Sequence, residues 1–170
     1  MNIILDSYPL PCVNDILADC TKGKIWSKLD MTNSFFQTQV HPDDIPLTTV
    51  TTPFGLYEWM VMPQGLKNGP LIHQQQMNSV LYEHIRKFCH IYIDDIIIWS
   101  YSIDDHKTNI DMVMNTLKNM RLFCNEKKCN FFLLELDFLG HHISACGIEP
   151  NGAKVRHILD WPTPKNSTDV

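Results

Sequence analysis

The sequence predicts an α+β fold in which helices pack on one face of an antiparallel sheet. Its 170 residues are 44% hydrophobic and 19% charged, which is typical of one globular domain with its own core. Helix-like and strand-like segments follow each other in mixed order, without a regular strand–helix alternation, and this favours helices beside an antiparallel sheet. The stretch IYIDDIII at residues 91–98 adds a hairpin, because two apolar arms flank a polar pair.

In the first third of the chain, helical spacing gives way to strand-like alternation. Val13, Ile16, Leu17 and Cys20 share one helical face, behind two prolines and ahead of a glycine, and these are start and stop signals of a short helix. The expected elements are a helix within 8–23, a strand at 24–30, a helix at 31–40, a break at 41–46 and two strands within 48–62 around a turn at 53–55.

Helical spacing resumes after a loop at residues 63–70, and Pro70 is a good first residue for the next helix. We expect the three glutamines at 74–76 on the exposed face of that helix. Ser102 and Asp105 form a capping box that opens another helix. The remaining expected elements are hairpin arms at 90–93 and 96–99, a helix from 102 that buries Ile110, Val113, Met114, Leu117 and Met120, a second hairpin within 129–144 and a last helix at 151–161.

Charge and cysteine usage limit the function classes. The formal net charge of −5 argues against a self-sufficient nucleic-acid binder, whose surface is normally basic. No apolar run approaches the roughly 18 residues of a membrane span, and no secretory signal opens the chain. The six cysteines include no CxxC pair, so we expect free thiols in an intracellular protein, cytoplasmic or nuclear, that is neither secreted nor partnered by a membrane.

Asp94 and Asp95 interrupt an apolar run, and burying two carboxylates in a strand costs several kcal/mol each unless they are paired or metal-bound. A position at the tip of a tight hairpin would avoid this cost, with both carboxylates projecting from one end. An Asp-Asp turn without chemistry is the alternative, since Asp is a common turn residue.

Asp30 ends one strand and directly precedes a helix-like segment. A carboxylate there can hold a cation, while the unsatisfied N–H groups of a helix start face an anion. An ordinary helix cap is the alternative for Asp30 taken alone. Together with Asp94 and Asp95, however, it supplies the carboxylates that two-metal phosphoryl transfer needs.

Four motifs then point to one family. YIDD at 92–95 resembles the catalytic hairpin of reverse transcriptases. WSKLDMTNSFFQTQVHPDDIPLTTVTTPFGLYEW, VMPQGLKNGP and FLGHHIS resemble the reverse transcriptase of gypsy-type LTR retrotransposons, in the family's order. The resemblance implies a polymerase palm with part of the fingers. It divides the single domain into a fingers-like part at about 45–75, a palm at about 20–44 and 76–148, and the start of a downstream connection at 149–170.

The resemblance implies that Asp30, Asp94 and Asp95 are the metal-binding triad for two Mg²⁺ or Mn²⁺ ions. In the family, the first aspartate and the first of the pair carry most of the coordination. The Met31 carbonyl would complete a metal shell. Lys128 falls where the family has a lysine proposed to protonate pyrophosphate; a solvated surface lysine is the alternative.

Other positions match the family's nucleotide and primer contacts. The backbone of Asn33, Ser34 and Phe35 would lie under the incoming triphosphate, and the Phe35 ring would leave no room for a 2′-hydroxyl; a core aromatic is the alternative. Gln64 matches the residue that hydrogen-bonds the sugar. The implied primer and template contacts are Tyr92, Gly65, Pro70 and the primer-grip turn Phe138, Leu139, Gly140 and His141.

The resemblance therefore implies an RNA-directed DNA polymerase that joins a dNTP to a primer 3′-OH on an RNA or DNA template. Further partners would be the remaining parts of a Pol polyprotein, RNase H and integrase. We expect weak or no activity from this piece alone, because the basic segment that grips the triphosphate is missing. The alternatives are an inactive retrotransposon remnant that binds nucleic acid or protein, and an unrelated Mg²⁺ phosphohydrolase.

Overall fold

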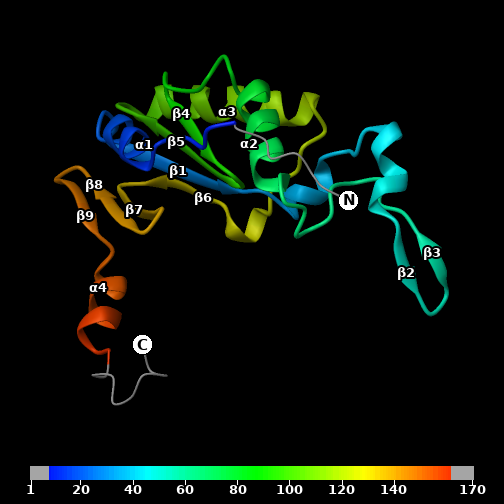
Figure 1. The fold of residues 1–170 in the computed structure, drawn as a ribbon. Coiled ribbons are helices and arrows are strands. Elements are labelled where there is room, and N and C mark those ends of the chain that lie inside the picture. Colours follow the sequence, from blue (N-terminus) through cyan, green and yellow to red (C-terminus); the bar gives the residue numbers. More distant parts are fainter. Residues whose placement is uncertain (1–7, 162–170) are drawn as a thin grey trace.

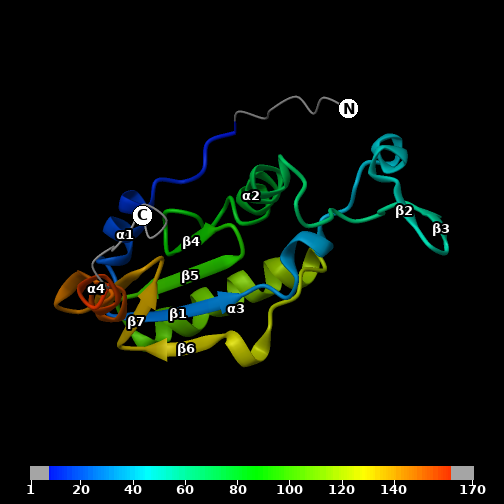
Figure 2. The same cartoon turned by 60° about the horizontal axis from the view of Figure 1, so that its bottom comes forward.

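The centre of the computed structural model, which describes residues 8–161, is a four-stranded antiparallel sheet (Figure 1). Its strand order is β4-β5-β1-β6, and Figure 2 shows the four strands side by side in this order. β1 pairs along its whole length with β5, so β1 and the β4–β5 hairpin form one continuous unit. The strands are β1 Ile25–Asp30, β4 Cys89–Tyr92, β5 Asp95–Ser100 and β6 Asn130–Leu133.

Two helices, α2 (Gly69–Val80) and α3 (Ile103–Asn119), cover one face of this sheet. Buried residues of both helices, among them Met77 and Val113, form one apolar cluster with alternate residues of β5, Ile96 and Ile98. Burial on this scale stabilises a fold by roughly 1.5–3 kcal/mol for each large apolar side chain. The predicted fold class, an antiparallel sheet with helices on one face, is confirmed.

The other face carries a second apolar cluster, which adds a layer that the sequence analysis did not include. Helix α1 (Val13–Cys20) and a small three-stranded sheet pack there against Trp26, Ile97 and Trp99. The small sheet has the order β7-β8-β9, and Figure 1 shows it on the side of the central sheet away from α2 and α3. Its strands are β7 Glu135–Phe138, β8 His141–Ser144 and β9 Gly147–Pro150.

Two parts extend from this body. The hairpin β2 (Val50–Thr52) and β3 (Gly55–Tyr57) projects from one end, and α4 (Gly152–Leu159) follows β9 at the other (Figure 1). The last nine residues of the predicted connection, 162–170, lie outside the described residues. Within the described part of the chain, no helix is both long and apolar enough to cross a membrane.

Local structure departs from the prediction in four places. Residues 31–40 contain only a 3-10 helix, Ser34–Gln37, because Asn33 adopts a left-handed backbone with φ 45° that breaks the α-helical path. Residues 41–46 are not a simple break, since the 3-10 helix Pro42–Thr48 covers them. The segment 129–144 is not one hairpin: β6 joins the central sheet beside β1, and only β7 and β8 form the hairpin.

The fourth departure concerns which side chains are buried. Met114 and Met120 of the α3 region are exposed, because the face that meets the sheet is set by Ile110, Val113 and Leu117. Gln74, expected on the exposed face of α2, is fully buried. It occupies the helical position three residues before Met77 and therefore shares that residue's inward face.

Candidate active site

The end of β1 and the start of β5 bring three aspartates together. Asp30 lies directly opposite Asp95 in the antiparallel pairing, and partners of this kind have Cα atoms about 4.5–5.5 Å apart. The carbonyl of Asp94, in the preceding turn, accepts a 3.1 Å hydrogen bond from the Met31 N–H. The structure thus places all three carboxylate residues and Met31 at one point of the fold.

The turn of the β4–β5 hairpin lies one residue earlier than expected. Its two turn residues are Ile93 and Asp94, because Tyr92 pairs with Asp95 as the last ladder pair. Ile93 has φ 57°, a conformation that usually requires glycine at the first turn position. This register keeps Asp95 within the sheet, opposite Asp30, and leaves Asp94 at the tip.

Asp95 has a lysine partner that the sequence analysis did not identify. Lys28 Nζ lies 2.9 Å from Asp95 Oδ1, and both side chains are about three-quarters buried. The same ammonium lies 5.8 Å from the centre of the Phe138 ring. Burial raises the pKa of Asp95 above its ordinary value, Lys28 opposes this shift, and the charges of Asp94 and Asp30 add to it.

Asp30 is paired with the predicted lysine. Lys128 Nζ, on a side chain that is mostly exposed, lies 3.4 Å from Asp30 Oδ1. The Asp30 carbonyl accepts a 2.8 Å hydrogen bond from the Asn125 N–H, which holds the loop carrying Lys128 against the end of β1. The Asp94 carboxylate, in contrast, makes no hydrogen bond or ion pair with any residue between 8 and 161.

The donor set fits a hard divalent cation. Carboxylate oxygens are the ligands that Mg²⁺ prefers, and two ammonium groups already lie against Asp30 and Asp95, as cations attracted to this negative region would. In the described part of the chain, no three His, Cys, Asp or Glu side chains are arranged as a ready metal cage. Asp30 and Asp94 are the carboxylates that could hold such a cation, since Lys28 already engages Asp95.

The predicted nucleotide-binding residues lie just beyond β1. Asn33 is exposed, Ser34 is buried and Phe35 is half-buried at the start of the 3-10 helix. The Phe35 ring lies 5.3 Å, centre to centre, from the buried His73 of α2. Burial lowers the pKa of His73, and the charge of Asp94 and the backbone of Ile93 oppose this, so His73 lies between Phe35 and the β4–β5 turn.

The loop before α2 approaches the same region. A Cβ on Gly69 would lie 3.9 Å from a carbon of the Phe35 ring, so the beginning of α2 packs beside that ring. Gln64 and Gly65 are exposed on the loop, and Gly65 has φ 88°, which glycine adopts without strain. Pro70 is in the first turn of α2, as predicted.

The predicted primer-grip residues form the turn of the β7–β8 hairpin. Leu139 and Gly140 both have positive φ, as in a two-residue hairpin turn of type I′. Phe138 is buried against the central sheet, and the ring of His141 bonds the Leu139 carbonyl at 3.1 Å. Tyr92, which pairs with Asp95 in the ladder, packs against the same cluster.

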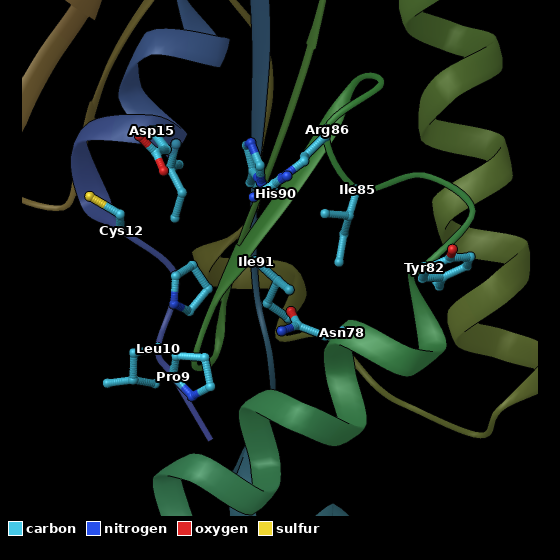
Figure 3. Close-up of a pocket in the computed structure, with 12 residues that line it drawn as sticks. Pro9, Leu10, Cys12, Asp15, Asn78, Tyr82, Ile85, Arg86, His90 and Ile91 are labelled. Carbon is cyan, nitrogen blue, oxygen red and sulfur yellow. The ribbon is translucent and has the colours of Figure 1, made fainter. Parts of the chain in front are cut away.

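A separate cavity of about 460 Å³ lies between α1, α2 and β4 (Figure 3). Asn78, Arg86, His90 and Ile91 are among its lining residues. None of the predicted site residues lines this cavity, so it is distinct from the cluster of aspartates.

Sequence reasoning missed two residues of the site, Lys28 and Gln74. Lys28 lies two residues before Asp30 in a strand, so the alternation of side chains already places it on the same face. Gln74 could have been found from its spacing to Met77 and Leu81, which marks an inward position. Its buried amide accepts a hydrogen bond from the Ile93 N–H in the turn.

Comparison with known proteins then decides the family. The family profile described as reverse transcriptase (RNA-dependent DNA polymerase) matches residues 2–143. The chain belongs to this family. Its aspartate cluster is therefore found in a reverse transcriptase domain.

The relatives of this reverse transcriptase domain are transposon polyproteins. It is 40% identical over 167 residues to the retrovirus-related Pol polyprotein from transposon opus of Drosophila melanogaster, with 98% of this chain and 17% of the relative covered. It is 35% identical to the Pol polyprotein from transposon 297 of the same species, and 32% identical to the transposon Tf2-3 polyprotein of Schizosaccharomyces pombe. These alignments cover 98% and 96% of this chain, and 16% and 12% of the relatives. The chain thus spans less than a fifth of the length of these relatives.

Solved structures agree on the fold of the reverse transcriptase domain. The foamy viral protease-reverse transcriptase in complex with double-stranded DNA superposes with a TM-score of 0.89 at 21% identity, over 98% of this chain and 29% of that one. The same viral protein in complex with an RNA/DNA hybrid gives a TM-score of 0.85 at 21% identity, over 96% of this chain and 22% of that one.

Proposed function

We propose that this chain is the catalytic portion of an RNA-directed DNA polymerase within a longer Pol polyprotein of a gypsy-type element. The observation that carries this proposal is the pairing of Asp30 with Asp95, with the Asp94 carbonyl bonded to the Met31 N–H. The division into a fingers-like part at about 45–75, a palm at about 20–44 and 76–148, and a connection from 149 belongs to the same proposal.

The reaction is attack of the primer 3′-hydroxyl on the α-phosphorus of a dNTP. A new oxygen–phosphorus bond forms, the bond between the α-phosphorus and the bridging oxygen breaks, and pyrophosphate leaves. Asp30, Asp94 and the Met31 carbonyl would hold two Mg²⁺ or Mn²⁺ ions. Bound there, these ions lower the pKa of the hydroxyl and stabilise the charge on the leaving oxygens.

The chain's own residues complete the site. Lys128, which lies beside Asp30, would give a proton to pyrophosphate, and Lys28 keeps Asp95 paired within the sheet. The backbone of Asn33 and Ser34 would support the triphosphate. The Phe35 ring, held beside His73, would exclude a 2′-hydroxyl and so select deoxynucleotides.

Template and primer complete the proposal. Gln64 would hydrogen-bond the sugar of the nucleotide, and the chain would contact an RNA or DNA template with its primer through Gly65, Pro70, Tyr92 and the β7–β8 turn at 138–141. The nucleic-acid complexes of the foamy viral protein, which has the same fold, support this arrangement. Since the chain carries a net charge of −5, the remaining polyprotein supplies most cations for the nucleic-acid backbone, in the cytoplasm or nucleus.

Primer extension tests the proposal. The assay uses a poly(rA) template with an oligo(dT) primer, and Mg²⁺ or Mn²⁺. Asp94→Asn should lower incorporation by about 100-fold or more, because it removes stabilisation of several kcal/mol from the transition state. Asp104→Asn, on the exposed start of α3, is the matched control and should extend like the wild type. Incorporation by Asp94→Asn equal to that of the wild type would contradict the proposal.

A further inference from the structure

Gln74 is a fully buried polar residue of α2 whose side chain reaches the β4–β5 hairpin. Its Oε1 accepts a 2.6 Å hydrogen bond from the Ile93 N–H. Its Nε2 donates to the Ile91 carbonyl at 3.1 Å and to Asn78 Oδ1 at 2.9 Å. One amide therefore satisfies the backbone on both sides of Tyr92, and Asn78 sets the orientation of that amide.

The bond to Ile93 is made at the most strained point of the hairpin. Ile93 has φ 57°, and a β-branched residue is a clear outlier in this left-handed region. Such backbone persists only where surrounding contacts hold it. Gln74 provides a contact of this kind, because it engages the N–H of the strained residue itself.

The second residue of the turn is held from the opposite side. The Asp94 carbonyl accepts the Met31 N–H at 3.1 Å, which ties the turn to the end of β1. With the backbone bonded on both sides, the direction of the Asp94 Cα–Cβ bond is fixed, and with it the set of positions that the carboxylate can reach. This matters because its carboxylate has no polar contact of its own within the described residues.

We propose that Gln74 is a positioning residue of the active site. It holds the Ile93–Asp94 turn in its left-handed conformation, so that the Asp94 carboxylate stays beside Asp30 and can bind a divalent cation. The inference rests on the proposed function, since it takes Asp94 as a cation ligand. It goes further by assigning the geometry of that ligand to a helix on the opposite face of the sheet.

The cation itself is the probe. Mn²⁺ affinity, measured from the electron paramagnetic resonance signal of free Mn²⁺, should fall about tenfold in Gln74→Met, the low end of losses for residues that orient ligands. Gln75→Met is the matched control, because the neighbouring glutamine is exposed. Hydrogen exchange of the Ile93 amide should be faster in Gln74→Met and unchanged in Gln75→Met. Unchanged Mn²⁺ affinity in Gln74→Met, with faster exchange at Ile93, would overturn the proposal.

A second background separates positioning from general stability. Glycine adopts positive φ without strain, so in Ile93→Gly the turn needs less support. The tenfold loss caused by Gln74→Met should therefore shrink to about twofold in this background. A full loss in both backgrounds, or a double variant that fails to fold, would show that Gln74 serves the core alone.

Asp94→Asn distinguishes failure of this inference from failure of the proposed function. If Asp94→Asn binds Mn²⁺ as tightly as the wild type, the cation site itself is wrong. If Asp94→Asn loses affinity and Gln74→Met does not, only the assignment of Gln74 fails.

Discussion

The two hairpins beside the active site are held in different ways. The β4–β5 hairpin lies at the centre of the protein, and its turn places Ile93 at φ 57° with support from Gln74. The β7–β8 hairpin lies on the surface of the sheet, and its turn uses Leu139 and Gly140. In the β7–β8 turn, Gly140 adopts positive φ without strain and only Leu139 does not, whereas the β4–β5 turn has no glycine and places a β-branched residue at positive φ.

This difference indicates which turn conformation is determined by local sequence and which by tertiary contacts. The β7–β8 turn is encoded locally, and the hairpin attaches through one face, on which Phe138 and Ile143 are buried. The β4–β5 turn is encoded by tertiary contacts that hold an unfavourable backbone. Strained backbone of this kind is found at sites where a side chain must be aimed.

The largest effect is expected when the attachment of the β7–β8 hairpin to the central sheet is broken. Phe138→Ala should lower the free energy of unfolding by about 3–5 kcal/mol, because a fully buried aromatic ring is lost from the cluster that joins the two sheets. Urea denaturation measures this. Phe123→Ala, at a position that is 66% exposed, should cost less than about 1 kcal/mol. Equal losses in the two variants would show that Phe138 does not anchor the hairpin.

A smaller effect compares the two turns directly. Gly140→Ala should cost about 1–2 kcal/mol, since Gly140 has φ 80°. Position 93 should also prefer glycine to alanine. Ile93→Gly should be more stable than Ile93→Ala by about 1 kcal/mol, because both variants lose the larger side chain but only glycine relieves the backbone strain. Thermal or urea unfolding of the three variants checks this. If Ile93→Ala is the more stable of its pair, the turn is not strained.

The smallest effect concerns pH. Burial lowers the pKa of His90 in β4, although Asp19 opposes this and Arg86 and Lys22 add to it. The hydrogen bond to Asp137 raises the pKa of His142 in β8. Below about pH 6.5 the unfolded chain therefore takes up a proton at His90 before the folded chain does, which destabilises the fold. His142 has the opposite effect. The stability that protonated His142 adds to the fold is present at low pH and is lost as pH rises through its raised pKa.

Urea unfolding at about pH 7 and about pH 5.5 tests both signs. His90→Gln should reduce the loss of stability on acidification, and His142→Gln should increase it. The opposite order would contradict the direction assigned to both pKa shifts, and equal effects would mean that the two hairpins hold their imidazoles alike.

The fold class could be predicted from the sequence because it depends on local patterns. The apolar arms around Asp94 and Asp95, the capping box at Ser102 and the spacing of α1 and α2 all appear in the structure. The features that the sequence analysis predicted wrongly depend on tertiary contacts. The left-handed backbone of Asn33 shortens the helix expected at 31–40, and β6 leaves its predicted partner to pair with β1.

The same division applies to the site. Motifs identified the aspartates and Lys128, and the structure brings these residues together. The partners that hold them carry only weak sequence signals: strand alternation places Lys28 on the face of Asp30, and spacing to Met77 places Gln74 on the inward face of its helix. Their contact partners follow from the pairing of β1 with β5 and from the packing of α2 under the turn. The roles of the predicted nucleotide and primer residues stay predictions.

The most direct test of the account is whether Asp30 and Asp94 bind a cation jointly. Mn²⁺ affinity should be measured for the wild type, Asp30→Asn, Asp94→Asn and the double variant, with Asp104→Asn as control. The account predicts a loss of about tenfold or more in each single variant and little further loss in the double variant, as for two ligands of one site. Independent, additive losses, or single variants that bind Mn²⁺ like the control, would contradict it.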